Sequence, residues 1–324
     1  MLMRLFAILV AAFLMAAGLP NMRVVPWQVV DVPTDRTLLD IAFTDSSPEH
    51  GWVVGDQGTL LETRDGGVNW TASQLQTSNP DYYLSSVDFD GAEGWIAGQP
   101  RVLLHTEDEG DRWLQIPLSD KLPGEPTLIT ALGPQTAEMV TNVGAIYTTE
   151  DGGRNWRAQV DDAVGVLRNV NRRDDGTYVS VSARGNFYAV YRPNSHEWQP
   201  FNRDSSRRLQ NMGFGPDGKA WKLNRGAEIS FTDDVLSGKW EKAQRPGRAL
   251  SFGYLDAAYQ DSDNIWVVGG SALVVHSPDS GKTWEEVGKL GKVPANFYSV
   301  SFPSRDRGFI LGQKGTLLRY TPAS

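Results

Sequence analysis

One eight-residue pattern recurs along the chain and constrains its fold more than any other feature. Residues 63–70 (TRDGGVNW) fit the frame Ser/Thr-x-Asp-x-Gly-x-x-Trp, as do residues 106–113 (TEDEGDRW), 149–156 (TEDGGRNW) and 277–284 (SPDSGKTW). Weaker copies end at Trp198 and Trp240. When Trp27 is included, the closing tryptophans are 43, 43, 43, 42, 42 and 44 residues apart. A fixed period near 43 residues is typical of repeat architectures.

Each repeat contains several short runs of β-branched and aromatic residues. In the first unit these runs lie at residues 38–43, 51–54 and 59–63, and a fourth follows at 71–75. Four short strands per unit at this period predict a propeller blade. The recurring frame would form the hairpin between the third and fourth strands, where Asp caps backbone N–H groups, Gly supplies positive φ and Trp buries its ring. The frame resembles the Asp-box, or bacterial neuraminidase repeat, so we interpret its aspartates as structural.

The two ends of the repeat region predict how the ring closes. The last unit has three runs only, at residues 297–302, 308–311 and 316–320, whereas residues 27–32 begin with a tryptophan that is in phase with the repeat. We therefore predict that the N-terminal strand completes the last blade, which leaves no free sheet edge between first and last blades. The predicted fold is an all-β, seven-bladed β-propeller with Asp-box (BNR-like) repeats over residues 27–321, without a linker or second domain.

Residues 1–18 have the composition of a secretory signal peptide. Arg4 precedes an apolar run at residues 5–17, and the small residues Ala16, Ala17 and Gly18 form a cleavage site. We expect export, with cleavage near Gly18 or retention of the segment as a short anchor. Bacterial lipoproteins carry a cysteine after such a run, but Leu19 follows here, so lipidation is not expected.

Composition excludes several classes of function. The net charge is −8, which argues against a nucleic-acid-binding protein. The chain contains no cysteine, which excludes disulfides, thiolate metal sites and cysteine nucleophiles. Its four histidines are isolated, and no His/Asp/Glu cluster has the spacing of a metal site. We therefore expect no metal, no cofactor and no catalytic residue.

Positive charge is concentrated in one part of the chain. Residues 163–226 hold nine arginines and two lysines against five carboxylates. In an up-and-down blade, the loop between strands two and three lies on the same face of the disc as the crossover to the next blade. Arg184 and Arg225 fall at equivalent two-to-three turns in neighbouring units. The crossover between these units holds three more arginines, Arg203, Arg207 and Arg208. We expect these five guanidinium groups to meet on one face.

These five arginines have two interpretations. They could form a solvated rim that local aspartates neutralise, or a surface that recognises an anionic partner. We favour the second hypothesis because arginine forms forked, bidentate contacts with carboxylates and because loops on a rigid scaffold commonly carry binding function. Arg172 and Arg173 fall at a one-to-two turn, so we expect them on the opposite face.

Several longer strings resemble the cyanobacterial and plastid photosystem II assembly and stability factor family. They are residues 131–139 (ALGPQTAEM), 144–147 (GAIY), 181–188 (VSARGNFY), 205–210 (SSRRLQ) and 296–298 (NFY). The resemblance implies a seven-bladed propeller, monomeric and peripherally associated with the lumenal side of the thylakoid membrane. It implies a non-catalytic assembly and repair factor that binds newly made D1 reaction-centre protein, including its precursor, and early photosystem II complexes. The family's arginine patch would correspond here to Arg184, Arg203, Arg207, Arg208 and Arg225.

Two other classes of protein remain open. An Asp-box sialidase would need three arginines that converge on one carboxylate, together with an acidic group and a Tyr–Glu nucleophile pair. The arginines here cluster across two blades, and no convergent pair of acids is evident. The second alternative is an extracytoplasmic propeller that binds another anionic partner.

Overall fold

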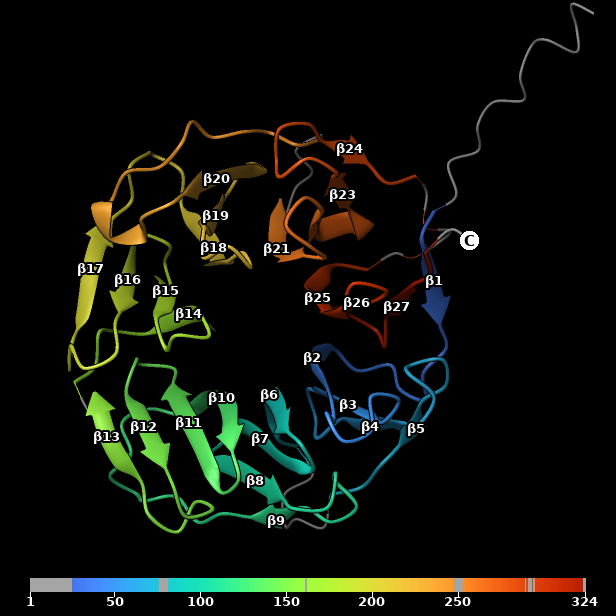
Figure 1. The fold of residues 1–324 in the computed structure, drawn as a ribbon, viewed down its shortest axis with the longest axis vertical. Coiled ribbons are helices and arrows are strands. Elements are labelled where there is room, and N and C mark those ends of the chain that lie inside the picture. The colour runs from blue at the N-terminus through green and yellow to red at the C-terminus, as the bar shows by residue number, and fades with distance from the viewer. Residues whose placement is uncertain are drawn as a thin grey trace, which may run out of the picture.

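The computed structural model describes residues 25–75, 81–160, 162–247, 253–288, 290, 293 and 295–322. In these ranges the strands form seven antiparallel sheets arranged around a central opening (Figure 1). The first strand of each chain unit lies innermost, and later strands lie progressively further from the centre (Figure 1). The prediction of an all-β, seven-bladed propeller is confirmed.

Blades one to four have four strands each. Blade one contains β2 (Leu38–Phe43), β3 (Gly51–Gly55), β4 (Leu60–Thr63) and β5 (Thr71–Ala72). Blade two contains β6 (Tyr83–Asp90), β7 (Glu93–Gln99), β8 (Val102–Thr106) and β9 (Leu114–Gln115). Blade three contains β10 (Pro126–Gly133), β11 (Thr136–Thr141), β12 (Ile146–Thr149) and β13 (Arg157–Val160). Blade four contains β14 (Leu167–Arg172), β15 (Tyr178–Ser182), β16 (Phe187–Tyr191) and β17 (Trp198–Asn202).

The remaining blades complete the ring. Blade five contains β18 (Leu209–Phe214), β19 (Ala220–Asn224) and β20 (Glu228–Thr232). Blade six contains β21 (Tyr254–Tyr259), β22 (Ile265–Gly269), β23 (Val274–Ser277) and β24 (Glu285–Glu286), with a short 3₁₀ turn η2 (Gly270–Ala272). Blade seven contains β25 (Phe297–Ser304), β26 (Arg307–Gly312), β27 (Leu317–Tyr320) and the N-terminal strand β1 (Trp27–Val30).

The expectation of four strands in every unit is wrong for blade five. Thr232 and Trp240 are one residue further apart than the matching residues of the Asp-box frame. The longer segment forms a 3₁₀ turn, η1 (Val235–Ser237), in which the Asp234 carboxylate accepts a hydrogen bond from Leu236 N at 3.0 Å. The chain then returns beside β20 through single backbone pairings, including Gln244 with Ile229, and forms no fourth strand.

The N-terminal strand closes the ring as predicted. Strand β1 pairs antiparallel with β27, with Trp27 opposite Tyr320 and Val30 opposite Leu317. The indole of Trp27 is 5% exposed and makes edge-to-face contacts with Trp266 and Tyr320, at centroid distances of 5.3 and 5.4 Å. Residues from opposite ends of the chain therefore share one hydrophobic cluster with blade six.

A separate hydrophobic core fills each interface between neighbouring blades. The cluster between blades one and two, for example, joins Trp52 and Val54 to Leu84 and Ile96. Closing tryptophans recur in these cores: Trp113 packs edge-to-face on Trp52 of the preceding blade at 5.9 Å. Since each blade buries its apolar faces against its two neighbours, the ring can grow without one large central core.

The Asp-box hairpins have the structure that their residues predict. The Asp65 carboxylate accepts hydrogen bonds from the backbone N–H groups of Val68 and Asn69, at 3.0 and 2.9 Å. Thr63 Oγ1 accepts one from Gly67 N at 3.0 Å, and Gly67 itself has a φ of 83°. These bonds lower the pKa of Asp65, chiefly through the Asn69 N–H. The carboxylate thus organises the turn and is occupied by it.

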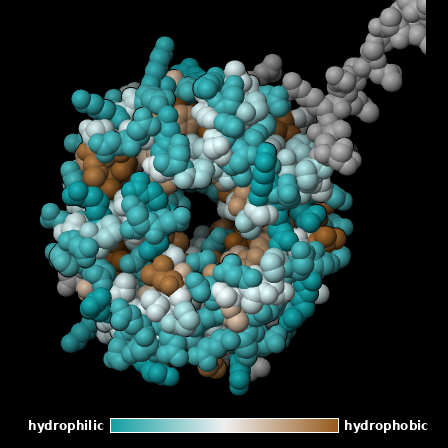
Figure 2. Space-filling view, in the orientation of Figure 1, coloured by the Kyte–Doolittle hydropathy of each residue, from teal (hydrophilic) through white to brown (hydrophobic). Residues whose placement is uncertain are grey.

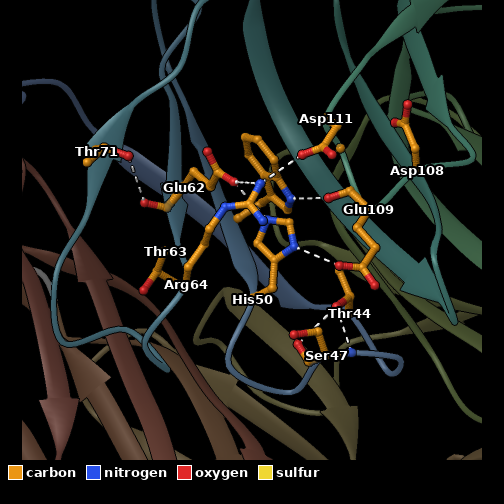
Figure 3. Close-up of polar contacts among 12 residues, drawn as sticks. Thr44, Ser47, His50, Glu62, Thr63, Arg64, Thr71, Asp108, Glu109 and Asp111 are labelled. Atoms are coloured by element: carbon orange, nitrogen blue, oxygen red, sulfur yellow. Dashed lines mark hydrogen bonds and ion pairs between the residues drawn. The ribbon is translucent and has the colours of Figure 1, made fainter.

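The face of the disc that carries the Asp-box hairpins also carries polar contacts between blades one and two (Figure 3). His50 lies between two carboxylates, with Nε2 2.9 Å from Glu62 and Nδ1 3.1 Å from Glu109 of the neighbouring hairpin. Arg64 also reaches across the interface and donates to Asp111 at 2.7 Å. These groups link adjacent hairpins, so we assign them a structural role.

The prediction for the N-terminal segment rests on its sequence alone. The signal peptide predicted for residues 1–18 lies outside the described residues. Across the described ranges, the structure contains no helix with the length and apolar character needed to span a membrane.

Replacing Trp27 by alanine tests the importance of ring closure. We expect Trp27→Ala to lower the free energy of unfolding by about 3–5 kcal/mol, because the change removes a buried ring from the interface of three chain segments. Val29→Ala in the same strand is the control, since Val29 is 46% exposed and its loss should cost less than about 1 kcal/mol. Urea unfolding of both variants measures the difference, and equal effects would contradict the role of Trp27 in closure.

Candidate protein-interaction surface

The five predicted arginines lie on three loops that meet on one side of blades four and five. Arg184 lies in the turn between β15 and β16, and Arg225 in the turn between β19 and β20. The crossover from β17 to β18 carries the other three, Arg203, Arg207 and Arg208. We call these five residues the arginine patch.

Backbone hydrogen bonds join the three loops. Leu209 N donates to Gly185 O at 2.9 Å, and Arg225 N donates to Arg208 O at 2.9 Å. Arg203 N reaches the first turn as well, through Asn186 O at 3.2 Å. Backbone hydrogen bonds therefore join the crossover to both turns. The prediction that these three loops lie on one face of the disc is confirmed.

Two glycines allow the loops to approach so closely. Gly185 has a φ of 66°, and a Cβ at this position would clash with Leu209 O. Gly226 has a φ of 91°, and its Cβ would collide with the guanidinium of Arg207. Both positions combine a left-handed backbone with a crowded neighbour, which only glycine accommodates without strain.

The guanidinium groups of the arginine patch differ in their partners. Arg207 is half-buried and forms an ion pair with Glu228, with Nε 3.1 Å from Oε1. For Arg184, Arg203, Arg208 and Arg225, no carboxylate of the described residues lies within ion-pair distance. The interpretation as a locally neutralised rim thus fits Arg207 and does not fit the other four.

Arginines outside the patch are paired more often. Arg172 lies 3.0 Å from Glu138, and Arg173 lies 2.6 Å from Asp175, both toward the opposite face as expected from their one-to-two turn. Arg245 shares Glu228 with Arg207, at 2.9 Å. Local compensation is therefore available in this protein, and the loops of the patch largely lack it.

The structure adds Arg168 to this surface. Its guanidinium donates to Ala183 O at 2.8 Å and to Gln210 Oε1 at 3.1 Å. Burial lowers the pKa of Arg168, and the positive charges of Arg225 and Arg208 lower it further, which places the three side chains in one electrostatic neighbourhood. Arg168 is one of the nine arginines of residues 163–226, and its face of the disc was not predicted. A signal was present in the sequence, because Arg168 is the second residue of β14, just after a crossover, and so belongs on the same face.

Arg168 also connects the patch to the central opening, which the space-filling view shows as a hole surrounded by mainly hydrophilic atoms (Figure 2). A cavity of ≈ 670 Å³ at this end of the opening is lined by Arg168, Gln210 and Tyr83, together with the carboxylates Asp40 and Asp256. An anionic partner on the patch would therefore meet a polar cavity beside it.

The carboxylates of Asp40, Asp88 and Asp256, which we call the channel carboxylates, accept hydrogen bonds from backbone N–H groups of the next blade. Asp40 accepts from Val87 N at 3.0 Å, and Asp256 accepts from Val300 N at 2.9 Å. Burial raises the pKa of Asp40 to about 6 and that of Asp256 to about 7. Burial likewise raises the pKa of Asp88, which bonds to Ala131 N, to about 7. These residues join the innermost strands, so we interpret them as structural.

The geometry does not resemble the site that a sialidase requires. Arg168 is the arginine that lines this cavity, while the arginine patch extends outward across blades four and five. Within the described part of the chain, no group of three or more His, Cys, Asp or Glu side chains is arranged to hold a metal ion.

Comparison with known proteins identifies the family. The family described as photosynthesis system II assembly factor YCF48 matches residues 19–321. The chain belongs to this family. A photosystem II assembly protein Ycf48 from Synechococcus sp. (strain JA-2-3B'a(2-13)) is 60% identical over 317 residues, covering 98% of this chain and 95% of the relative.

Two further YCF48 proteins bear on membrane association and on partner binding. One from Trichormus variabilis, named an assembly lipoprotein, is 52% identical and covers 98% of this chain and 94% of its own length. A solved structure described as YCF48 bound to D1 peptide is 49% identical, with a TM-score of 0.90 over 94% of this chain and 97% of that one. The resemblance inferred from the sequence strings is confirmed.

The channel carboxylates predict how the stability of this YCF48 family member depends on pH. A folded-state pKa above the unfolded value of about 4 means that folding binds protons, so stability falls as pH rises toward 7. We expect the free energy of unfolding to fall between pH 5 and pH 8. Asp256 should contribute about 1–2 kcal/mol of this, less than full burial would give, because it is partly exposed in the cavity wall. Urea unfolding of wild type and Asp256→Asn at both pH values measures this, and an identical pH dependence in the two proteins would contradict it.

Proposed function

We propose that this chain is a non-catalytic assembly and repair factor that binds newly made D1, including its precursor, and early photosystem II reaction-centre complexes. We propose further that the arginine patch is its docking surface. One observation supports this assignment most directly. In a chain of net charge −8, four guanidinium groups of one loop cluster have no carboxylate partner among the described residues. Family membership and the neighbour described as bound to D1 peptide supply the partner.

The chemistry of the patch favours a carboxylate-bearing partner. Arginine presents a planar fork of N–H donors that matches a carboxylate in two parallel hydrogen bonds. Arg184, Arg208 and Arg225 are exposed, and the backbone beneath them is fixed by hydrogen bonds between the loops. Because the loops are already ordered, little conformational entropy is lost when a partner docks. Acidic side chains or a free carboxyl terminus of D1 would satisfy these groups.

The proposed location follows from the same family. We propose that the protein is exported, acts as a monomer and associates peripherally with the lumenal side of the thylakoid membrane. Two relatives are named lipoproteins, and bacterial lipoproteins carry their lipid on a cysteine, a residue that this chain does not contain. Its attachment would therefore depend on the partner complex or on the N-terminal segment.

Other classes of function receive less support. An Asp-box sialidase would need three arginines that converge on one carboxylate, whereas the cavity of ≈ 670 Å³ has a single arginine, Arg168, among its lining residues. A different anionic partner would use the same surface, so the binding experiment below includes complexes without D1. Purified protein tested with sialosides provides the check on catalysis, and turnover would contradict a non-catalytic role.

Alanine substitution of the whole arginine patch tests the docking surface. We expect this fivefold variant to fold normally, since its side chains lie on loops, and to bind D1-containing complexes at least about 100-fold more weakly. Wild-type association should slow as salt rises, because steering by exposed charge is screened over about 8 Å at physiological ionic strength. Binding is measured with detergent-solubilised complexes that contain D1, with complexes that lack D1, and with overlapping synthetic peptides that cover D1.

A matched variant controls for net charge. It carries alanine at five exposed cations in or beside the hairpins of the opposite face, Arg112, Arg154, Arg157, Arg192 and Lys282. Both variants lower the net charge by the same amount. Weaker binding of both to a similar degree would show that overall charge, not the arginine patch, attracts the partner. Unchanged binding of a folded patch variant would overturn the assignment of these residues.

A further inference from the structure

Lys222 occupies a position that five of the other six blades fill with apolar side chains and that blade four fills with Ser180. It lies in the middle of β19, opposite Met212, and is 2% exposed. The strand registers place five apolar residues at the matching position of the second strand in other blades: Val53, Ile96, Met139, Val267 and Ile310. Packing alone therefore does not require a lysine here.

The ammonium group of Lys222 has one ionic partner in the described structure. Its Nζ lies 2.7 Å from Asp204 Oδ2, and the ring of Trp240 covers it at 4.5 Å from the ring centroid. Trp240 packs edge-to-face on Tyr188, which stacks on Phe201 at 5.0 Å. The charge is thus held at the apolar interface of blades four and five, on the side where Asp204 approaches from the surface.

Burying the Lys222 ammonium group costs free energy, because the charge loses contact with water. Desolvation lowers the pKa of Lys222, and the hydrogen bond and charge of Asp204 act in the opposite direction. A buried ammonium is tolerated when it is paired, and it becomes costly when the partner is removed. The pair therefore holds Asp204 against the blade more firmly than a surface ion pair would.

Asp204 belongs to the crossover that carries three residues of the arginine patch. It directly follows Arg203 and lies three residues before Arg207. Arg207 is itself tied to Glu228 of β20. Side chains of blade five therefore hold the crossover at two points, and the exposed Arg208 lies just beyond the second.

We propose that the Lys222–Asp204 pair holds the arginine-bearing crossover in its docking conformation, so that Lys222 is a positioning residue for the arginine patch. The inference rests on the proposed function, because it assigns this pair to the same binding surface. Lys222 does not touch the partner. It reduces the number of conformations that Arg203, Arg207 and Arg208 must give up when the partner docks.

Two single substitutions separate positioning from simple charge. Lys222→Met uses a side chain that blade three already carries at this position, and it makes the surroundings of the patch more negative by one charge. Asp204→Ala makes them more positive by one charge. If charge alone mattered, the two variants would change the affinity for an anionic peptide in opposite directions. If the pair positions the crossover, both variants bind more weakly, by about three- to tenfold, with faster dissociation.

The probe is the D1 peptide that wild-type protein binds most tightly, with affinity and dissociation rate measured at two salt concentrations. The double variant Lys222→Met/Asp204→Ala restores the net charge, and we expect it to bind about as weakly as either single variant. Lys219→Met is the matched control. Lys219 also pairs with a carboxylate, Glu241 at 2.8 Å, and lies against the ring of Phe231, but it belongs to a one-to-two turn on the opposite face.

Each outcome decides the proposal. Weaker binding in both single variants and in the double variant, with Lys219→Met unchanged, supports it. Opposite shifts in the single variants, or unaltered dissociation in all of them, overturn it. Asp204 is 46% exposed, so the Asp204→Ala arm stays decisive if Lys222→Met fails to fold. If the fivefold arginine variant loses binding while these variants keep it, only the positioning role is wrong; if the fivefold variant also binds, the proposed function itself fails.

Discussion

The ring depends on apolar packing between neighbouring blades, and at four of the seven interfaces the closing tryptophan of one blade packs edge-to-face on an aromatic ring of the preceding blade. Trp113 makes this contact with Trp52, and Trp156 makes it with Trp95 at 6.1 Å. Trp27 makes it with Trp266, although Trp27 comes from the other end of the chain. A blade has two apolar faces and no independent core, so it must pack against a neighbouring blade on each face. The N-terminal strand thereby converts a row of repeats into a closed disc.

A closed disc also explains why exposed, unpaired arginines are tolerated. The loops of the arginine patch are short, joined by backbone hydrogen bonds and attached to strands whose cores lie elsewhere. Their guanidinium groups remain solvated, so the lack of carboxylate partners costs the fold little. Where arginines approach the body of the blades they are paired, as Arg172 is with Glu138 and Arg207 with Glu228. The paired arginines thus stabilise the blades, and the unpaired arginines are the ones that we propose for recognition.

Blade five departs most from the repeat, and its departures lie beside the patch. It lacks the fourth strand, replaces the Asp-box with a 3₁₀ turn and carries Lys222 where five of the other six blades carry apolar residues. Repeat proteins commonly break their own pattern at functional sites. In blades one to three, where the Asp-box frame is intact, the corresponding contacts serve the links between blades, as the groups around His50 do.

The sequence by itself determined the number of blades, their order, the closure by β1 and the face on which Arg184 and Arg225 lie. These features follow from periodicity and from local turn chemistry, since a residue's phase within the repeat decides its place in the blade. Only the tertiary structure decided that Arg207 is paired with Glu228, that Arg168 joins the surface and that Lys222 reaches Asp204. Those contacts join residues 15 to 21 positions apart on different loops and strands. They depend on side-chain direction and on the packing between two blades, which no period in the sequence specifies.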